Sequence, residues 1–396
     1  MKTFLISVSI LLISVTCSAQ KSVLKVNPKW ENSIQNVACE IKSFDSEDFS
    51  DLVFLKQLLK DKQYLFIGES SHEVAEFFKL RTRLIKFLHE QMGFKIIAFE
   101  NDLNTTTFFN IQKDQALSID SLMLYLGYFP CMEMCELVKY LRKNDIVTTG
   151  FDVQLSNTAI FSPAVRYYFK ITDSILNDDS LFCVNAQNSI DAHTLAKKWN
   201  NAITGISGYD TLSSFAKCIY KSIKTRADWM ERMPNISSPM RDSLMAANFL
   251  WLIKNMYPKE KVIILAHNEH IAKFNPAFKD KKKYYGSMGQ YLQDSIWEKS
   301  YVMGIYAFQG QTGNYGPLCT ISANKRNSLG AIFNCTGYDI SFCDFLSQNK
   351  SVENNWMFKK KIKTVSYCFQ RYKMVPADHY DGIIMVKNVH AITKLK

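Results

Sequence analysis

The sequence predicts an α/β fold, with a mainly parallel central sheet flanked by helices and a helical insertion. Of the 396 residues 47% are hydrophobic and 21% are charged, which is enough apolar material for a large core. Short apolar runs alternate with long amphipathic ones, as in strand–helix–strand units around a parallel sheet. Residues 155–240 lack clear apolar strand runs and are expected to form the helical insertion.

The individual elements follow from these runs in order. Residues 64–67 form a strand candidate, residues 73–92 have helical periodicity, and Gly93 is placed to end that helix in the left-handed conformation. The later candidates are a strand at 95–99, a helix at 132–142, a strand at 146–149, a helix at 241–256 and strands at 262–266, 302–308 and 382–386.

The N-terminus has the pattern of an export signal. Lys2 precedes an apolar stretch over residues 4–15, which is too short to span a bilayer, and Cys17-Ser18-Ala19 follows as a small-residue exit. We therefore expect a signal peptide over residues 1–19 and a mature periplasmic or extracellular protein without stable membrane insertion. A lipid anchor on Cys17 is a rival interpretation, disfavoured by the approach Ser14-Val15-Thr16. The expected organisation continues with an N-terminal extension over 20–60 and a single domain over 61–396.

The charge and the cysteine content argue against some classes of function. The net charge is +11, but basic residues are scattered among acidic ones, which favours an ordinary surface over a nucleic-acid groove. The nine cysteines left after signal removal are widely dispersed, so one or two disulfides are possible and their pairing is not readable. Cys131 and Cys135 lie four residues apart without a second close pair, which argues against a zinc site.

Ionisable residues follow the ends of four predicted strands. They are Glu69 and His72, then Glu100, then Asp152, and finally His267, Glu269 and His270. A single acid after a strand is usually a turn or helix cap. Because the carboxyl ends of parallel strands meet at one edge of a sheet, four such ends together favour a functional site.

Arg81 lies on the apolar face of the predicted 73–92 helix, together with Phe77 and Leu84. A buried arginine needs a carboxylate partner, and Glu69 and Glu100 are the candidates by topology. The alternative is that Arg81 extends its charged end to the helix edge. Arg241 lies in a similar way on the apolar face of the 241–256 helix.

These residues belong to segments that match a family. The segments FIGESSHEVAEFFKLRTRLIKFLHEQMGFKIIAFE, GFD, RDSLMAANFLWLI, VIILAHNEH and MGQYL resemble, in order and spacing, the erythromycin esterase family. The resemblance runs from about residue 61 to about residue 308, with a weaker echo at 380–384. It implies an α/β catalytic domain with a helical insertion. It also implies hydrolysis of an ester or lactone, such as the lactone of a macrolide antibiotic, by an activated water.

Carried over to this sequence, the family's catalytic residues are the general base His72, the motif glutamates Glu69 and Glu100, the helix arginine Arg81, and the later histidines His267 and His270. All six are present. The sequence departs from the family at Ser71 and Glu73, where Thr and Gly are frequent, and at Leu265 and Ala266, where a tryptophan is frequent. These departures border the pocket, so they affect the substrate more than the chemistry.

The expected mechanism follows from ordinary acid–base chemistry. Imidazole has an unperturbed pKa of about 6.5, which suits His72 as the base that activates water. Glu69 or Glu100 would orient it, and His267, His270 and Arg81 would serve the oxyanion or keep the glutamates ionised. We expect a small-molecule ester or lactone substrate, and neither a cofactor nor a metal.

Two alternatives remain open at this stage. His72, His267, His270 and the two glutamates could bind zinc or manganese in a metal-dependent hydrolase, although the HExxH motif is missing. The same cleft could also serve a non-catalytic exported ligand-binding protein.

Overall fold

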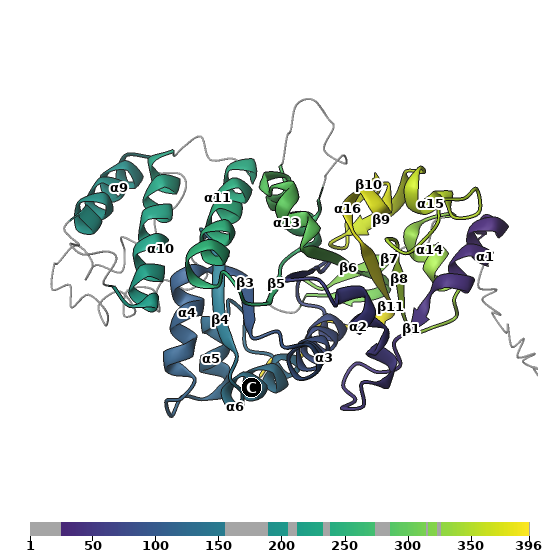
Figure 1. The fold of residues 1–396 in the computed structure, drawn as a ribbon, viewed down its shortest axis with the longest axis horizontal. Coiled ribbons are helices and arrows are strands. Elements are labelled where there is room, and N and C mark those ends of the chain that lie inside the picture. Colours follow the sequence, from purple (N-terminus) through teal and green to yellow (C-terminus); the bar gives the residue numbers. More distant parts are fainter. Residues whose placement is uncertain are drawn as a thin grey trace, which may run out of the picture.

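The computed structural model describes residues 25–154, 189–204, 212–232, 238–273, 286–313, 316–322 and 326–395. The expected signal peptide over residues 1–19 and the first part of the expected insertion lie outside the described residues. Figure 1 shows a central sheet with helices on both faces, the insertion helices at one edge and the N-terminal helix α1 at the other. No helix in the described ranges is long and apolar enough to cross a membrane.

A nine-stranded sheet forms the middle layer, in the order β1-β8-β11-β6-β2-β5-β3-β4, with β7 paired to β6. The strands are β1 (Cys39–Glu40), β2 (Tyr64–Ile67), β3 (Ile96–Asp102), β4 (Val147–Asp152), β5 (Val262–Leu265), β6 (Ser300–Thr312), β7 (Cys319–Ser322), β8 (Ile340–Asp344) and β11 (Gly382–Val389). Every neighbouring pair from β11 to β4 is parallel, whereas β8 pairs antiparallel with both its neighbours. The predicted, mainly parallel α/β fold is therefore confirmed.

The central strands are buried on both faces, which explains their continuous apolar sequences. In β2, Leu65 and Ile67 join one core while Tyr64 and Phe66 join the other. The first core is covered by α2 (Phe54–Leu59), α3 (Ala75–Met92), α5 (Ile119–Tyr125) and α6 (Cys135–Lys143). The second is covered by α1 (Pro28–Val37), α11 (Ser238–Trp251), α14 (Leu329–Asn334) and α15 (Asn355–Phe358).

Several elements differ from the predicted boundaries. Helix α3 begins at Ala75 because Glu73 is in the left-handed region, with φ at 56°, and Val74 is extended. It ends at Gly93 with φ at 72°, as expected. Strands β3 and β4 run on to Asp102 and Asp152, so Glu100 lies inside its strand and not after it. The predicted 132–142 helix is a 3-10 turn (Met132–Met134) followed by α6, and α11 is followed by a π-helical turn (Leu252–Met256).

Within the expected insertion, the described residues form α9 (Ser189–Thr204) and α10 (Ser214–Glu231). Helix α10 packs on α4 (Leu103–Gln112) and α11, and the buried Ser222 donates a hydrogen bond of 2.9 Å to Asp102. The remaining short helices are α12 (Asn268–Ile271), α13 (Asp294–Glu298), α16 (Pro376–His379) and the 3-10 turns Ser50–Leu52 and Met288–Tyr291.

The sequence pattern did not reveal an antiparallel hairpin of β9 (Ile362–Ser366) and β10 (Gln370–Met374), which lies outside the main sheet. Its strands alternate buried and exposed residues and carry charged side chains, so they contain no apolar run. The disulfide between Cys319 and Cys368 ties the turn of this hairpin to β7.

The order of the strands positions the site. Strands β2 and β5 are neighbours, but the chain leaves β2 through α3 toward β3 and leaves β5 through α13 toward β6, in opposite directions along the sheet. Diverging connections of this kind open a crevice at the carboxyl ends of the two strands, where ligands bind in open α/β sheets.

Candidate active site

A cavity of about 320 Å³ lies at these strand ends. Its wall includes three of the six predicted site residues, Glu69, His72 and Glu100, together with Asp152 and Arg241. The volume is at the lower end of the range typical of small-molecule sites. The structure therefore has a cavity lined by ionisable groups at the place that the strand order predicts.

At the end of β2, the buried carboxylate of Glu69 joins two side chains. Its Oε2 accepts a hydrogen bond of 2.8 Å from Nη1 of Arg81, and its Oε1 lies 2.8 Å from Nδ1 of His72. Nη2 of Arg81 donates to the carbonyl oxygens of Ile67 (3.3 Å) and Ala266 (2.9 Å). Arg81 is thus buried and paired with Glu69, and the alternative that it extends to the helix edge is wrong.

His72 is the exposed member of this group, with 49% of its side chain accessible. Because the Glu69 carboxylate can only accept, Nδ1 of His72 carries the proton and Nε2 keeps a lone pair. Burial of the ring disfavours its charged form, but the hydrogen bond and charge of Glu69, helped by the charge of Glu100, outweigh this and raise the pKa of His72. His72 is therefore a somewhat stronger base than free imidazole.

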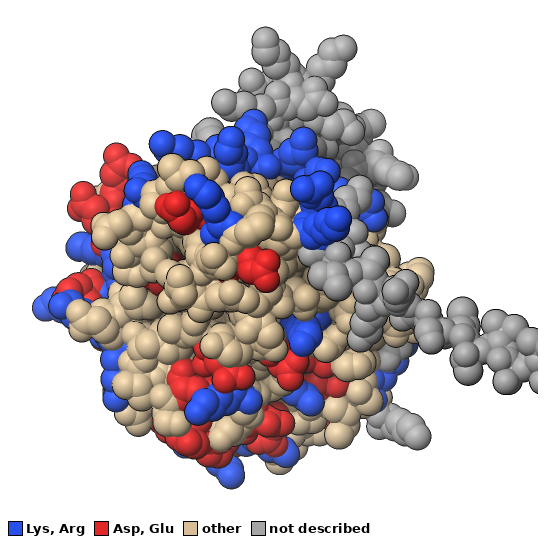
Figure 2. Space-filling view, turned by 90° about the vertical axis from the view of Figure 1, so that its right-hand side faces the viewer, with Lys and Arg blue, Asp and Glu red and all other residues tan. Residues whose placement is uncertain are grey.

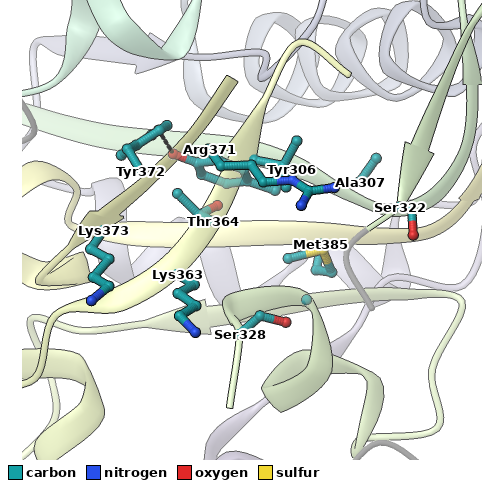
Figure 3. A pocket seen from close by; sticks show the side chains of 12 residues that line it. Tyr306, Ala307, Ser322, Ser328, Lys363, Thr364, Arg371, Tyr372, Lys373 and Met385 are labelled. Carbon is teal, nitrogen blue, oxygen red and sulfur yellow. Dashed lines mark hydrogen bonds between the residues drawn. The ribbon is translucent and has the colours of Figure 1, made fainter. Parts of the chain in front are cut away.

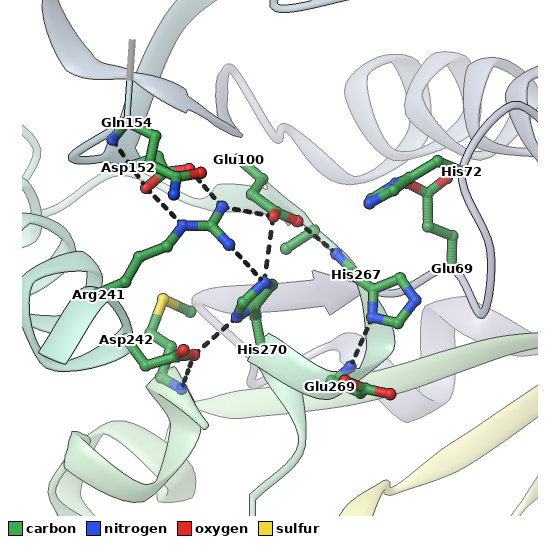
Figure 4. Close-up of polar contacts among 12 residues, drawn as sticks. Glu69, His72, Glu100, Asp152, Gln154, Arg241, Asp242, His267, Glu269 and His270 are labelled. Atoms are coloured by element: carbon green, nitrogen blue, oxygen red, sulfur yellow. Dashed lines mark hydrogen bonds and ion pairs between the residues drawn. The ribbon is translucent and has the colours of Figure 1, made fainter. Parts of the chain in front are cut away.

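Glu100 anchors a second cluster on the other side of the crevice (Figure 4). Its Oε2 accepts a hydrogen bond of 2.7 Å from the backbone N–H of His267, and its Oε1 accepts one of 2.9 Å from Nη2 of Arg241. Arg241 also forms an ion pair with Asp152. Burial alone would raise the pKa of Glu100, but the charges of His270 and Arg241 hold it well below its ordinary value. Glu100 is therefore ionised throughout the neutral range.

His270 is a fixed cation in this cluster. Its Nδ1 lies 2.7 Å from Oδ1 of Asp242 and its Nε2 lies 3.2 Å from Oε1 of Glu100. Burial disfavours the charged ring, but the two carboxylates raise the pKa of His270 to about 10. Both ring nitrogens then carry protons, so the 3.2 Å contact between Nε2 and Nη1 of Arg241 joins two donors and is no hydrogen bond. Within the described residues, Nη1 of Arg241 thus keeps its hydrogens for another acceptor.

His267 lies between the two clusters, with ring centroids 5.2 Å from His72 and 6.4 Å from His270. Burial, with the charge of His72, holds its pKa well below the ordinary value, so the ring is neutral. Its Nδ1 accepts a hydrogen bond of 3.2 Å from the backbone N–H of Glu269, and the ring stacks on Tyr367 at 4.5 Å. The ring is outside the cavity wall. The expected role of His267 as a donor to the oxyanion does not fit this position.

The structure gives roles to residues that were not among the six predicted catalytic residues. Asp152 was already expected at the strand ends, and Arg241 had a visible signal because it lies on an apolar helix face. Asp242 and Tyr367 had none. Tyr367 reaches His267 only through the turn between β9 and β10, where its own φ is 50°.

Comparisons with known proteins show which proteins this chain resembles. The model of the erythromycin esterase family matches residues 213–389. YbfO of Bacillus subtilis (strain 168), which carries the name of an inferred hydrolase, is 26% identical, and the match covers 91% of each chain. Erythromycin esterase type II of Escherichia coli is 25% identical over 68% of this chain and 75% of its own length.

Solved structures share the fold. A Bacillus cereus protein superposes with a TM-score of 0.74 at 17% identity, covering 93% of this chain and 99% of that one. A mutant of the erythromycin esterase EreC in its open conformation superposes with a TM-score of 0.63 at 15% identity, covering 89% of this chain and 98% of that one. The sequence matches thus confirm the resemblance to the erythromycin esterase family that was seen in the sequence, and they support a hydrolase, while the solved structures share the fold.

Proposed function

We propose that this protein is an exported hydrolase that cleaves an ester or lactone bond with water activated by His72. The observation that carries the proposal is the Glu69–His72 pair. Its carboxylate is buried and held by Arg81, while its imidazole is half exposed in a cavity at the strand ends. A fixed carboxylate behind an accessible imidazole is the arrangement that general-base catalysis requires.

The proposed reaction uses these groups in turn. Nε2 of His72 takes a proton from water, and the resulting hydroxide attacks the carbonyl carbon. Glu69 stabilises the imidazolium, and Nη1 of Arg241 donates to the oxyanion of the tetrahedral intermediate. Collapse of the intermediate breaks the carbon–oxygen bond, and His72 returns its proton to the leaving alkoxide.

A second hollow, of about 350 Å³, supports a substrate with a large apolar part. It lies on the other side of His72 and includes Leu318, Tyr367, Phe369 and the Cys319–Cys368 disulfide. Leu318 and Phe369 are 58% and 75% exposed, and because both line this hollow they offer apolar surface to a ligand. The charged cavity and the apolar hollow would hold opposite sides of the scissile bond. Macrolide lactones have such a body, and antibiotic resistance would be the outcome of their hydrolysis.

The metal-dependent alternative finds less support in the donor set. The oxygens of Glu69 and Glu100 already accept hydrogen bonds from guanidinium groups, and both ring nitrogens of His270 point at carboxylates. In the part of the chain that the structure describes, no three His, Cys, Asp or Glu side chains are arranged to hold a metal ion. We therefore propose His72 as a free base and not as a ligand.

The test is a screen of the purified mature protein against macrolides and diverse esters, read by mass for the addition of one water. We expect at least one substrate to gain water with the wild type and not with His72→Ala. His390→Ala is the matched control, because His390 is exposed and pairs with Glu76 away from the cavity. Tight binding without any turnover would contradict the proposal and favour the ligand-binding alternative. A mature N-terminus near Gln20 in the exported protein tests the expected signal cleavage.

A further inference from the structure

A separate cavity of about 190 Å³ lies beside the hairpin of β9 and β10, away from the active site (Figure 3). Its inner wall is apolar and comes from the main sheet, where Tyr306 and Ala307 belong to β6 and Met385 belongs to β11. The volume corresponds to about six water molecules at about 30 Å³ each. The cavity is thus large enough for a short apolar group and too small for a macrolide.

The outer wall of this cavity is cationic. It carries Lys363 from β9, and Arg371 and Lys373 from β10, all exposed. Lys363 stands directly opposite Lys373 in the antiparallel pair, and Arg371 shares a face with Lys373 because it is two residues away. Like charges directly opposite each other destabilise a sheet. Among the described residues, no carboxylate lies within ion-pair distance of these three side chains, so the fold itself does not offset this cost.

The surroundings strengthen the positive potential. Lys359, Lys360 and Lys361 precede β9 and are exposed as well. Figure 2 shows the side of the molecule that lies on the right in Figure 1. Lys and Arg side chains gather near the top of that side, at the height of β9, β10 and α15 in Figure 1, while most acidic side chains lie lower. Clustered charge of one sign raises the local concentration of oppositely charged ligands.

We propose that this cavity is a binding site for a small amphiphilic anion, with its carboxylate or phosphate held by the paired Lys363 and Lys373 and its apolar group against Met385, while Arg371 adds positive charge to the same wall. Charge-assisted hydrogen bonds to an anion would offset the repulsion between the opposed lysines. Burial of the apolar group would distinguish such a ligand from a simple inorganic ion.

The same hairpin connects this cavity to the active site. At its turn, Tyr367 stacks on His267 and Ser366 Oγ lies 3.4 Å from Nε2 of that ring. Along β10, the hydroxyl group of Tyr372 lies 2.9 Å from that of Tyr306. An anion that fixes the hairpin would therefore also fix the stacked pair beside His72. This coupling rests on the proposed function, whereas binding of the anion does not.

Isothermal titration of the full mature protein with hexanoate and hexyl phosphate tests the site, with acetate, inorganic phosphate and hexanol as comparison ligands. We expect both amphiphilic anions to bind at least about tenfold more tightly than acetate, phosphate or hexanol, and to bind more weakly as salt is raised. Equal affinity for hexanoate and acetate would overturn the proposal, because the apolar wall would then contribute nothing.

Two charge-matched double variants locate the binding. Lys363→Gln/Lys373→Gln should weaken hexanoate binding at least about tenfold and, without ligand, leave Tm unchanged or raised, because the opposed charges are gone. Lys359→Gln/Lys360→Gln removes the same charge outside the cavity and should retain most of the affinity. Equal losses in both variants would mean general surface attraction and would overturn the site.

Activity separates the two proposals. Saturating hexanoate should change KM or kcat for an ester in the wild type and have no effect in Lys363→Gln/Lys373→Gln. If hexanoate binds but the rate of ester hydrolysis is unchanged, the coupling is wrong and the binding site still stands. Absence of any hydrolysis would instead contradict the proposed function.

Discussion

Two clusters in the site contain the same three kinds of side chain. In each, a buried or nearly buried carboxylate lies between a guanidinium and an imidazole: Glu69 with Arg81 and His72 after β2, and Glu100 with Arg241 and His270 across β3, α11 and α12. Their composition is the same, but their accessibility differs. The side chain of His72 is 49% exposed, whereas that of His270 is 12% exposed.

The two imidazoles also differ in the number of carboxylates that they contact. Among the described residues, Glu69 is the one carboxylate within ion-pair distance of His72, while His270 contacts both Glu100 and Asp242, and the pKa of His270 rises to about 10. The first imidazole is accessible to a water molecule that could give it a proton, and the second stays charged at neutral pH. A carboxylate between an arginine and a histidine therefore specifies no role by itself. Exposure and the second carboxylate decide whether the group moves a proton or holds a charge.

The largest expected effect is the loss of the exposed imidazole. His72→Ala should lower kcat by at least about a hundredfold, the low end for losing a positioned base, and leave the fold intact by circular dichroism. Glu100→Gln should cause a loss of similar size. A folded His72→Ala enzyme with near-normal turnover would contradict the proposed division of roles.

Arg81→Ala tests how much the first cluster depends on its buried cation. The substitution leaves the Glu69 carboxylate buried without its partner, so we expect a loss of about 3–5 kcal/mol in the free energy of unfolding, together with loss of activity. Denaturant unfolding measures it, and Lys79→Ala, which removes an exposed cation from the same helix, is the control. An unchanged free energy of unfolding would show that the buried pair of Arg81 and Glu69 contributes no net stability.

The pH dependence should separate the two imidazoles. As a base, His72 must be neutral, so kcat/KM should rise with pH through an apparent pKa above 6.5, and Glu69→Gln should move that inflection to lower pH. His270 should act on stability instead. Because its pKa is about 10 in the folded state, its stabilising contribution is complete below about 6.5 and disappears as pH rises to about 10. His270→Gln should reduce the change in the free energy of unfolding over this pH interval.

The smallest expected effect is that of metal removal. A coordinated nitrogen has no lone pair for a proton, so His72 acting as a base must be free of metal. We expect hydrolysis to survive prolonged chelation, and protein purified without a histidine tag to contain less than one equivalent of transition metal. Stoichiometric zinc with chelator-sensitive, metal-restorable turnover would make the histidines ligands.

The sequence predicted the first cluster better than the second. Glu69, His72 and Arg81 belong to one strand–helix unit, where helical periodicity places Arg81 over the strand end. The second cluster gathers Glu100, Asp152, Arg241 and Asp242 from three distant segments. Periodicity places each on a face of its own element but does not say which elements touch. The stacking of Tyr367 on His267 depends on a charged, half-exposed hairpin and had no sequence signal.

The disulfide between Cys319 and Cys368 makes the site sensitive to its surroundings. It closes a loop across 49 residues, and a cross-link of that span is worth about 4 kcal/mol in the chain-entropy model. The bond joins β7 to the turn that carries Tyr367, so it tethers the apolar wall beside the base. Disulfides persist in oxidising compartments and are rare in a reducing cytosol. Under the export proposed above, the same polypeptide would have a firm apolar wall outside the cell and a looser one inside it, and its choice of substrate would depend on the compartment.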